Sequence, residues 1–124
     1  MEKLLEIKNL SVGFSLDDKV IQVVRGVSLE IAKNETLVLA GESGSGKSVT
    51  SLAITKILPA NARILSGEVY FGGEDLLKMD EEGLSAIRGG EIAYIFQEPS
   101  SFLNPVYTIG AQISEAIILH QKKN

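Results

Sequence analysis

The segment from Gly41 to Ser48, GESGSGKS, places glycines, a lysine and a hydroxyl at a spacing suited to binding phosphate. Gly44 and Gly46 allow the backbone to curl, so that successive N–H groups point into one concavity. Lys47 supplies a full positive charge, and Ser48 offers a hydroxyl to Mg²⁺. The segment therefore predicts a phosphate loop for a nucleotide. The simpler alternative is a Gly/Ser-rich linker or a plain turn between a strand and a helix.

The elements around this loop favour the phosphate-binding interpretation. Thr36–Ala40 is a short continuous apolar run, typical of a strand buried on both faces. After the loop, apolar residues from Val49 to Ile57 share one face of a helix, which we expect to stop at Pro59. A helix N-terminus adds unpaired N–H groups and a partial positive charge. The residues expected to contact the nucleotide are consecutive: Gly41, Glu42, Ser43, Gly44, Ser45, Gly46, Lys47, Ser48 and Val49.

The rest of the chain reads as alternating strands and helices. Leu4–Phe14 and Val20–Ile31 alternate apolar and polar residues and predict an antiparallel pair. Further strands are expected at Gly67–Phe71 and Glu91–Phe96, and a turn with a left-handed residue at Asn34. A short helix should start at the cap Asp80 and end before Gly89, and a last helix should follow the cap Thr108.

Composition excludes several kinds of protein. The 124 residues contain no cysteine and one histidine, which excludes disulfides, thiolate zinc sites and multi-histidine metal sites. The formal net charge of −4 gives no basic footprint for nucleic acid. No apolar run is long enough to span a membrane, and no secretory signal is visible. We therefore expect one domain in the cytoplasm.

Three stretches carry a resemblance to a known family: GESGSGKSVTSLAI (Gly41–Ile54), GEVYFGGEDLL (Gly67–Leu77) and IFQEPSSFLNPVYTIGAQISEAI (Ile95–Ile117). In them the chain resembles the first part of an ATP-binding cassette (ABC) ATPase, more narrowly the ATP-binding subunits of oligopeptide, dipeptide and nickel importers. The third stretch is the most specific, because a phosphate loop alone would also suit kinases and GTPases.

The resemblance implies an α/β fold: an incomplete P-loop NTPase core of the ABC type with an N-terminal antiparallel β subdomain. It divides the chain into four parts. Residues 1–35 would form the β hairpin, and residues 36–58 the strand, phosphate loop and helix. Residues 59–97 would form a strand, a helix and a strand up to the glutamine loop. Residues 98–124 would hold that loop and the first helix of a helical subdomain.

The resemblance also implies roles for single residues. Phe14 matches the aromatic residue that stacks on adenine, although it could be an ordinary core phenylalanine. Gln97 matches the glutamine placed near Mg²⁺ and the attacking water, so Ser48 and Gln97 are the expected metal ligands, with ATP and Mg²⁺ as cofactors. The alternative for Gln97 is a solvent-exposed residue at a strand end. His120 lies in the wrong element to be the family's switch histidine and is expected to face solvent.

By the same resemblance, the loop Glu98–Tyr107 would contact transmembrane permease subunits and couple nucleotide state to permease shape. A second ATPase subunit, identical or paralogous, would complete each nucleotide site. The protein would then be peripheral on the inner face of the cell membrane. No nucleic acid partner is expected.

The family pattern requires parts that this sequence does not contain: the serine-glycine-glycine signature, an apolar strand ending in Asp-Glu, and the switch histidine. The chain alone is therefore expected to be a poor ATPase or none, because it lacks a general base. It would be the N-terminal part of a longer subunit or a truncated product. The alternatives are a nucleotide-binding module without activity and a fragment of a non-transport ABC ATPase. Thr36–Ala40 and Ile92–Phe96 would be left underpaired, so the isolated chain should oligomerise or rearrange its strands.

Overall fold

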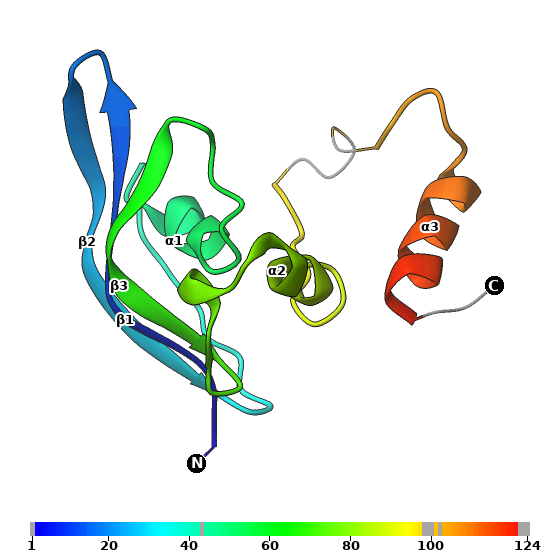
Figure 1. Ribbon diagram of the computed structural model, residues 1–124, viewed down its shortest axis with the longest axis horizontal. Coiled ribbons are helices and arrows are strands. Elements are labelled where there is room, and N and C mark those ends of the chain that lie inside the picture. The colour runs from blue at the N-terminus through cyan, green and yellow to red at the C-terminus, as the bar shows by residue number, and fades with distance from the viewer. Residues whose placement is uncertain (1, 43, 98–100, 102, 122–124) are drawn as a thin grey trace. The chain divides into compact units, whose positions relative to one another are not determined.

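The computed structural model describes residues 2–42, 44–97, 101 and 103–121, in two compact units, residues 1–79 and 80–124. Figure 1 shows the elements in chain order. They are β1 (Lys3–Leu16), β2 (Lys19–Ala32), α1 (Lys47–Ala53), β3 (Ala62–Phe71), β4 (Glu74–Asp75), the 3₁₀ turn η1 (Leu76–Lys78), α2 (Glu81–Ile87) and α3 (Ile109–Gln121).

The first unit is built on an antiparallel sheet with the strand order β2-β1-β3-β4. The predicted hairpin is confirmed: β1 and β2 pair along their length and turn at Asp17, which has a positive φ of 54°. The strand predicted at Gly67–Phe71 starts earlier, at Ala62, and pairs with β1. Asn34 has a φ of 64°, as its predicted left-handed turn requires.

One face of this sheet carries the core. The least exposed apolar side chains of β1 and β3 are Ile7, Leu10, Val12 and Val69. Lys8 and Asn9 separate Ile7 from Leu10 in β1, and the register of β1 against both neighbouring strands shifts at this point. Helix α1 packs against β1 and β2 (Figure 1). Burying each side chain of this kind contributes about 1.5–3 kcal/mol to the free energy of folding.

Gly67 lets β3 cross β1 closely at an irregularity in their pairing. Its φ is +111°, and a Cβ atom there would lie 2.6 Å from Leu10 Cα and 2.8 Å from the carbonyl oxygen of Asn9. These neighbours are backbone atoms and cannot turn aside. The position therefore requires glycine.

The helix after the phosphate loop ends earlier than predicted. Lys56 takes a left-handed conformation with a φ of 57°. Its N–H donates to the carbonyl of Ala53 at 3.2 Å, and the N–H of Ile57 donates to that of Leu52 at 3.0 Å. This is the paired Schellman closure of a helix C-terminus. The end is thus set by this cap and not by Pro59.

The prediction of a buried strand at Thr36–Ala40 is corrected by the structure. The run has no assigned strand, and all five residues are exposed, Val38 to 80%. A strand of a parallel sheet needs neighbours on both edges and cover on both faces. The described residues supply neither here, so apolar sequence alone does not produce a strand.

The second unit begins with α2, which matches its prediction. The Asp80 carboxylate accepts a hydrogen bond of 2.8 Å from the N–H of Gly83, a standard N-cap contact. The helix buries Leu84 and Ile87, and Arg88 forms an ion pair of 3.0 Å with Glu81.

The strand predicted at Glu91–Phe96 is also corrected. The structure has only an isolated bridge between Arg88 and Ile92, followed by chain without assigned strand. The side chain of Ile95 is 94% exposed. The rings of Tyr94 and Phe96 stack with centroids 6.0 Å apart. Glu91–Phe96 forms no strand for the same reason as Thr36–Ala40, because no described strand pairs with it.

The last helix, α3, begins as predicted after Thr108, whose hydroxyl accepts a hydrogen bond of 3.1 Å from the N–H of Ala111. All its residues are exposed except Gln112, which is half-buried. No helix in the described part of the chain has the length and hydropathy needed to cross a membrane.

Candidate phosphate-binding site

The described part of the loop before α1 is curled through two left-handed glycines. Gly44 and Gly46 both have positive φ angles, 84° and 95°. The N–H of Ser45 donates to the carbonyl oxygen of Glu42 at 3.1 Å, which closes the turn. Left-handed residues at this spacing turn successive N–H groups toward one side. Ser43, also predicted to contact the nucleotide, lies outside the described residues.

Two glycines of the loop lie close to other atoms of the chain. A Cβ atom at Gly41 would lie 2.7 Å from Ser45 Oγ. One at Gly46 would lie 3.2 Å from the carbonyl oxygen of Val23 and 3.4 Å from Val24 Cγ2, both on β2. The loop is therefore curled tightly on itself and held against the sheet.

The start of α1 is anchored by Thr50, which the sequence analysis did not identify. Gly46 is the N-cap and makes no side-chain cap hydrogen bond. Its carbonyl oxygen accepts two hydrogen bonds from Thr50, from the N–H at 2.9 Å and from Oγ1 at 2.8 Å. Thr50 is 4% exposed. A helical Ser or Thr often donates its hydroxyl to the carbonyl oxygen four residues earlier in the chain. Thr50 lies four residues after Gly46, and this spacing is the signal that could have predicted the contact.

The side chains at the mouth of the loop are those expected for a phosphate. The Lys47 ammonium group donates a hydrogen bond to the carbonyl oxygen of Gly41, which holds the charge over the loop. Lys47 and Val49 are half-buried, whereas Glu42 and Ser48 are exposed. The Ser48 hydroxyl therefore lies in the first turn of α1, open to solvent.

Phe14 lies on the sheet face that carries the phosphate loop. It is half-buried and pairs with Ile21 on β2 and Ala62 on β3. Val12, two residues earlier on the same face, pairs with Val24, the residue that Gly46 approaches. Phe14 is thus about 7 Å along the strand from the row that supports the loop. An adenine-stacking role for Phe14 stays a prediction, and this placement is consistent with it.

The predicted pairing of Ser48 with Gln97 at a metal stays a prediction. Gln97 is exposed and belongs to the second unit, whereas Ser48 belongs to the first. No group of three His, Cys, Asp or Glu side chains among the described residues could hold a metal ion. A single hydroxyl does fit Mg²⁺ that takes its other ligands from phosphate and water.

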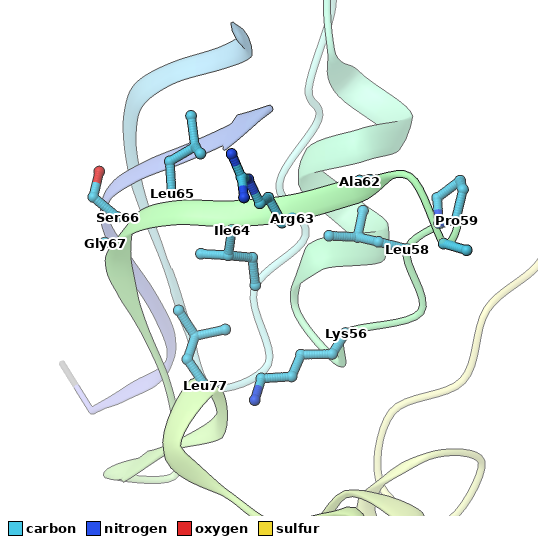
Figure 2. A pocket seen from close by; sticks show the side chains of 11 residues that line it. Lys56, Leu58, Pro59, Ala62, Arg63, Ile64, Leu65, Ser66, Gly67 and Leu77 are labelled. Atoms are coloured by element: carbon cyan, nitrogen blue, oxygen red, sulfur yellow. The ribbon is translucent and has the colours of Figure 1, made fainter. Parts of the chain in front are cut away.

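A pocket of about 620 Å³ lies in the first unit between the exit of α1 and the edge of β3 (Figure 2). Its walls are mainly apolar, with Leu58, Pro59, Ile64 and Leu77 among them. Lys56 also lines it, and none of the phosphate-loop residues does. Its described lining contains no Asp or Glu and two basic residues, Lys56 and Arg63.

The clearest pKa shifts lie away from the phosphate loop, on the solvent face of the sheet. A hydrogen bond from Lys3 lowers the pKa of the Glu6 carboxyl, and the Glu30 and Glu6 carboxylates raise the pKa of Lys3. The hydrogen bond to Glu68 raises the pKa of Tyr70 to about 12. These shifts come from exposed ion pairs and hydrogen bonds, so they indicate no catalytic group.

His120 is exposed on α3, as predicted, yet its ring lies against backbone. A Cβ atom at Gly89 would lie 2.8 Å from His120 Nε2, and one at Gly90 3.3 Å from Nδ1. The two glycines form the turn after α2 and leave room for the imidazole. The residue therefore has a packing contact in the second unit.

These observations agree with comparisons to known proteins. Residues 24–123 match the family described as ABC transporter, so the chain belongs to the ABC transporter family. It is 43% identical to a dipeptide transport ATP-binding protein and 44% identical to an oligopeptide transport ATP-binding protein, both of Bacillus subtilis, over 98% and 97% of its length.

The chain spans only about a third of these relatives, 37% and 34% of their lengths. Its fold is similar to a solved post-hydrolysis dimer of the ATP-binding cassette MJ0796 with bound ADP and Pi. The TM-score is 0.83 at 25% identity, over 97% of this chain and 49% of that one. The expected fold, an incomplete P-loop core of the ABC type with an antiparallel β subdomain, is confirmed.

Proposed function

We propose that this chain is the nucleotide-binding part of an ABC importer subunit that couples ATP binding and hydrolysis to the uptake of peptides or a related solute. The observation that carries the proposal is the curled loop Gly41–Ser48, held against β2 and followed by an uncapped helix start. The likeness to peptide transport ATP-binding proteins supports the solute class.

In this proposal the loop binds the triphosphate through its backbone N–H groups. The Lys47 ammonium leaves the Gly41 carbonyl and pairs with the β- and γ-phosphates, which offer full negative charge instead of a carbonyl dipole. Phe14 stacks on the base from the same sheet face. Thr50 keeps the Gly46 carbonyl turned into the helix, which fixes the junction between the loop and α1.

Ser48 would hold Mg²⁺ through its hydroxyl, and Gln97, by the family resemblance, would be the glutamine that acts on the metal and the attacking water. When bound, Mg²⁺ neutralises charge on the phosphates. Hydrolysis also requires a general base, which the family places after the segments found in this sequence. We therefore assign nucleotide binding to this chain and turnover to a complete subunit.

We infer that the partners are permease subunits and a second ATPase subunit. In the described part of the loop Glu98–Tyr107, Leu103, Val106 and Tyr107 are exposed, Val106 to 80%. Exposed apolar side chains on one short segment are typical of a protein contact. Binding to a permease would place the protein on the inner face of the membrane.

Thermal unfolding with MgATP tests nucleotide binding. At a hundredfold excess over Kd, bound nucleotide should stabilise the chain by about 2.7 kcal/mol and raise its melting temperature. The variant Lys47→Ala should lose this shift and unfold like the wild type without ligand. Lys33→Ala, an exposed lysine outside the loop, is the matched control and should keep the full shift. An equal shift in Lys47→Ala would remove Lys47 from the phosphate site.

A further inference from the structure

The turn before α3 is held by an unusual concentration of hydrogen bonds on one side chain, Gln112. Its Oε1 accepts from the N–H of Asn104 at 2.9 Å. Its Nε2 lies within hydrogen-bond distance of three carbonyl oxygens, of Asn104 at 3.0 Å, Tyr107 at 3.1 Å and Thr108 at 3.4 Å. One amide therefore ties the first turn of the helix to both ends of the preceding loop.

The turn itself has the residues its geometry requires. The N–H of Tyr107 donates to the carbonyl oxygen of Asn104 at 3.3 Å, which closes a four-residue turn with Pro105 in the second position. The Asn104 side chain accepts a further hydrogen bond of 3.0 Å from the N–H of Val106. Proline and asparagine favour such a turn locally. Among the described residues, Gln112 is the only one whose side chain connects this turn to α3.

Burial singles out the same residue. Gln112 is the one residue of α3 in the described chain that is not exposed. The turn it holds presents Val106 and Tyr107 to solvent, 80% and 64% exposed. An exposed turn with two apolar side chains would lose conformational freedom on binding a partner. A fixed turn has already lost that freedom, which favours association.

We propose that Gln112 is the positioning residue of the partner-contacting turn Asn104–Tyr107. Its amide holds Val106 and Tyr107 in the orientation that meets the permease, and so it acts on coupling without touching nucleotide. This inference rests on the proposed function, since it takes the permease as the partner of this turn.

Hydrogen exchange on this chain tests whether Gln112 holds the turn Asn104–Tyr107. The backbone N–H groups of Asn104 and Tyr107 should exchange about tenfold faster in Gln112→Ala, because their hydrogen bonds depend on the held turn. Gln112→Glu keeps the size and the acceptor but turns a carboxylate toward three carbonyls, so it should show the same loss. Gln121→Ala, the same change on an exposed residue of α3, should exchange like the wild type.

The effect of Gln112 on coupling is tested by ATPase assays of the full-length subunit assembled with its permease. We expect Gln112→Ala and Gln112→Glu to bind MgATP like the wild type and to lose most of the permease-stimulated ATPase activity, about tenfold. Gln121→Ala should retain it. If the wild type shows no stimulation by a permease, the proposed function fails. If it does and the Gln112 variants keep either their slow exchange or their stimulation, the inference about Gln112 is overturned.

Discussion

The sheet of the first unit and the run Thr36–Ala40 are both rich in apolar residues, and only the sheet is ordered into strands. In β1, Ile7 is 1% exposed between two paired strands, whereas Val38 is 80% exposed. Both are β-branched and suit a strand equally well. The difference is the neighbour: β1 has β2 on one edge and β3 on the other. Pairing, and not strand propensity, decides which apolar run is buried.

The largest effect is expected at Gly67, where the pairing of β3 with β1 is closest. Gly67→Val places a branched side chain at a φ of +111°, with its Cβ 2.6 Å from Leu10 Cα. Backbone strain and overpacking together should destabilise the chain by about 4 kcal/mol. Urea unfolding followed by circular dichroism measures this.

The matched control for that variant is Gly72→Ala. Gly72 also has a positive φ, +58°, but a Cβ there would meet nothing within 4 Å. The expected loss is about 1 kcal/mol, from backbone conformation alone. Equal losses at both glycines would mean that the close approach to Leu10 adds nothing to the cost of a side chain at Gly67.

Truncating one apolar residue in each region tests the comparison directly. Ile7→Ala should lower the free energy of unfolding by about 3 kcal/mol, because it removes buried methyl groups and leaves a cavity. Val38→Ala should change it by less than about 0.5 kcal/mol, because that side chain is already in solvent. The same unfolding experiment measures both. A loss in Val38→Ala close to that in Ile7→Ala would show that Thr36–Ala40 is buried.

The comparison also explains which parts of the fold could be predicted from sequence. The hairpin, the Asp80 cap and the Thr108 cap follow from residues near one another in the chain, and all three predictions are confirmed. The pairing of β3 with β1 depends on residues about 60 positions apart and was not predicted. Strands were expected at Thr36–Ala40 and Glu91–Phe96 from composition, which cannot reveal whether a partner is present.

Some features of the molecule's sites could likewise be predicted from the sequence, and others could not. The conformations of Gly44 and Gly46 follow from the motif itself, because each glycine is needed for a left-handed backbone. The contacts of Thr50 and Gln112 were missed, since a threonine or a glutamine in a helix has several possible partners. Only the folded chain brings these side chains to the carbonyl oxygens of Gly46 and Asn104.

Unpaired apolar residues should also cause self-association, with a smaller effect for each side chain. We expect the isolated chain to associate through Thr36–Ala40, where Leu37, Val38 and Leu39 are exposed. Burying one valine contributes about 1.5 kcal/mol, so Val38→Lys should weaken association about tenfold. Size-exclusion chromatography with light scattering over a range of concentrations measures this, with Gln121→Lys as the control for added charge. A monomer at every concentration would contradict the prediction.

The helix cap at Asp80 should have a still smaller and more local effect. Asp80→Ala removes the acceptor for the N–H of Gly83 and should destabilise α2 by about 1 kcal/mol. Asp80→Asn keeps an oxygen in the same place and should change little. Faster hydrogen exchange at Gly83 in the alanine variant alone would support the assignment, and equal exchange in both variants would contradict it.

The smallest effect concerns the exposed face of the paired region, where Tyr70 on β3 donates a hydrogen bond to Glu68. This bond raises the pKa of Tyr70 to about 12, from an ordinary value near 10. Because the raised pKa favours the protonated phenol in the folded state, its contribution to stability is complete below about pH 10 and is lost as the pH rises toward 12. Glu68→Gln removes the negative charge and should return the pKa toward 10, as measured by tyrosinate absorbance. An unchanged titration would mean that Glu68 does not raise the pKa of Tyr70.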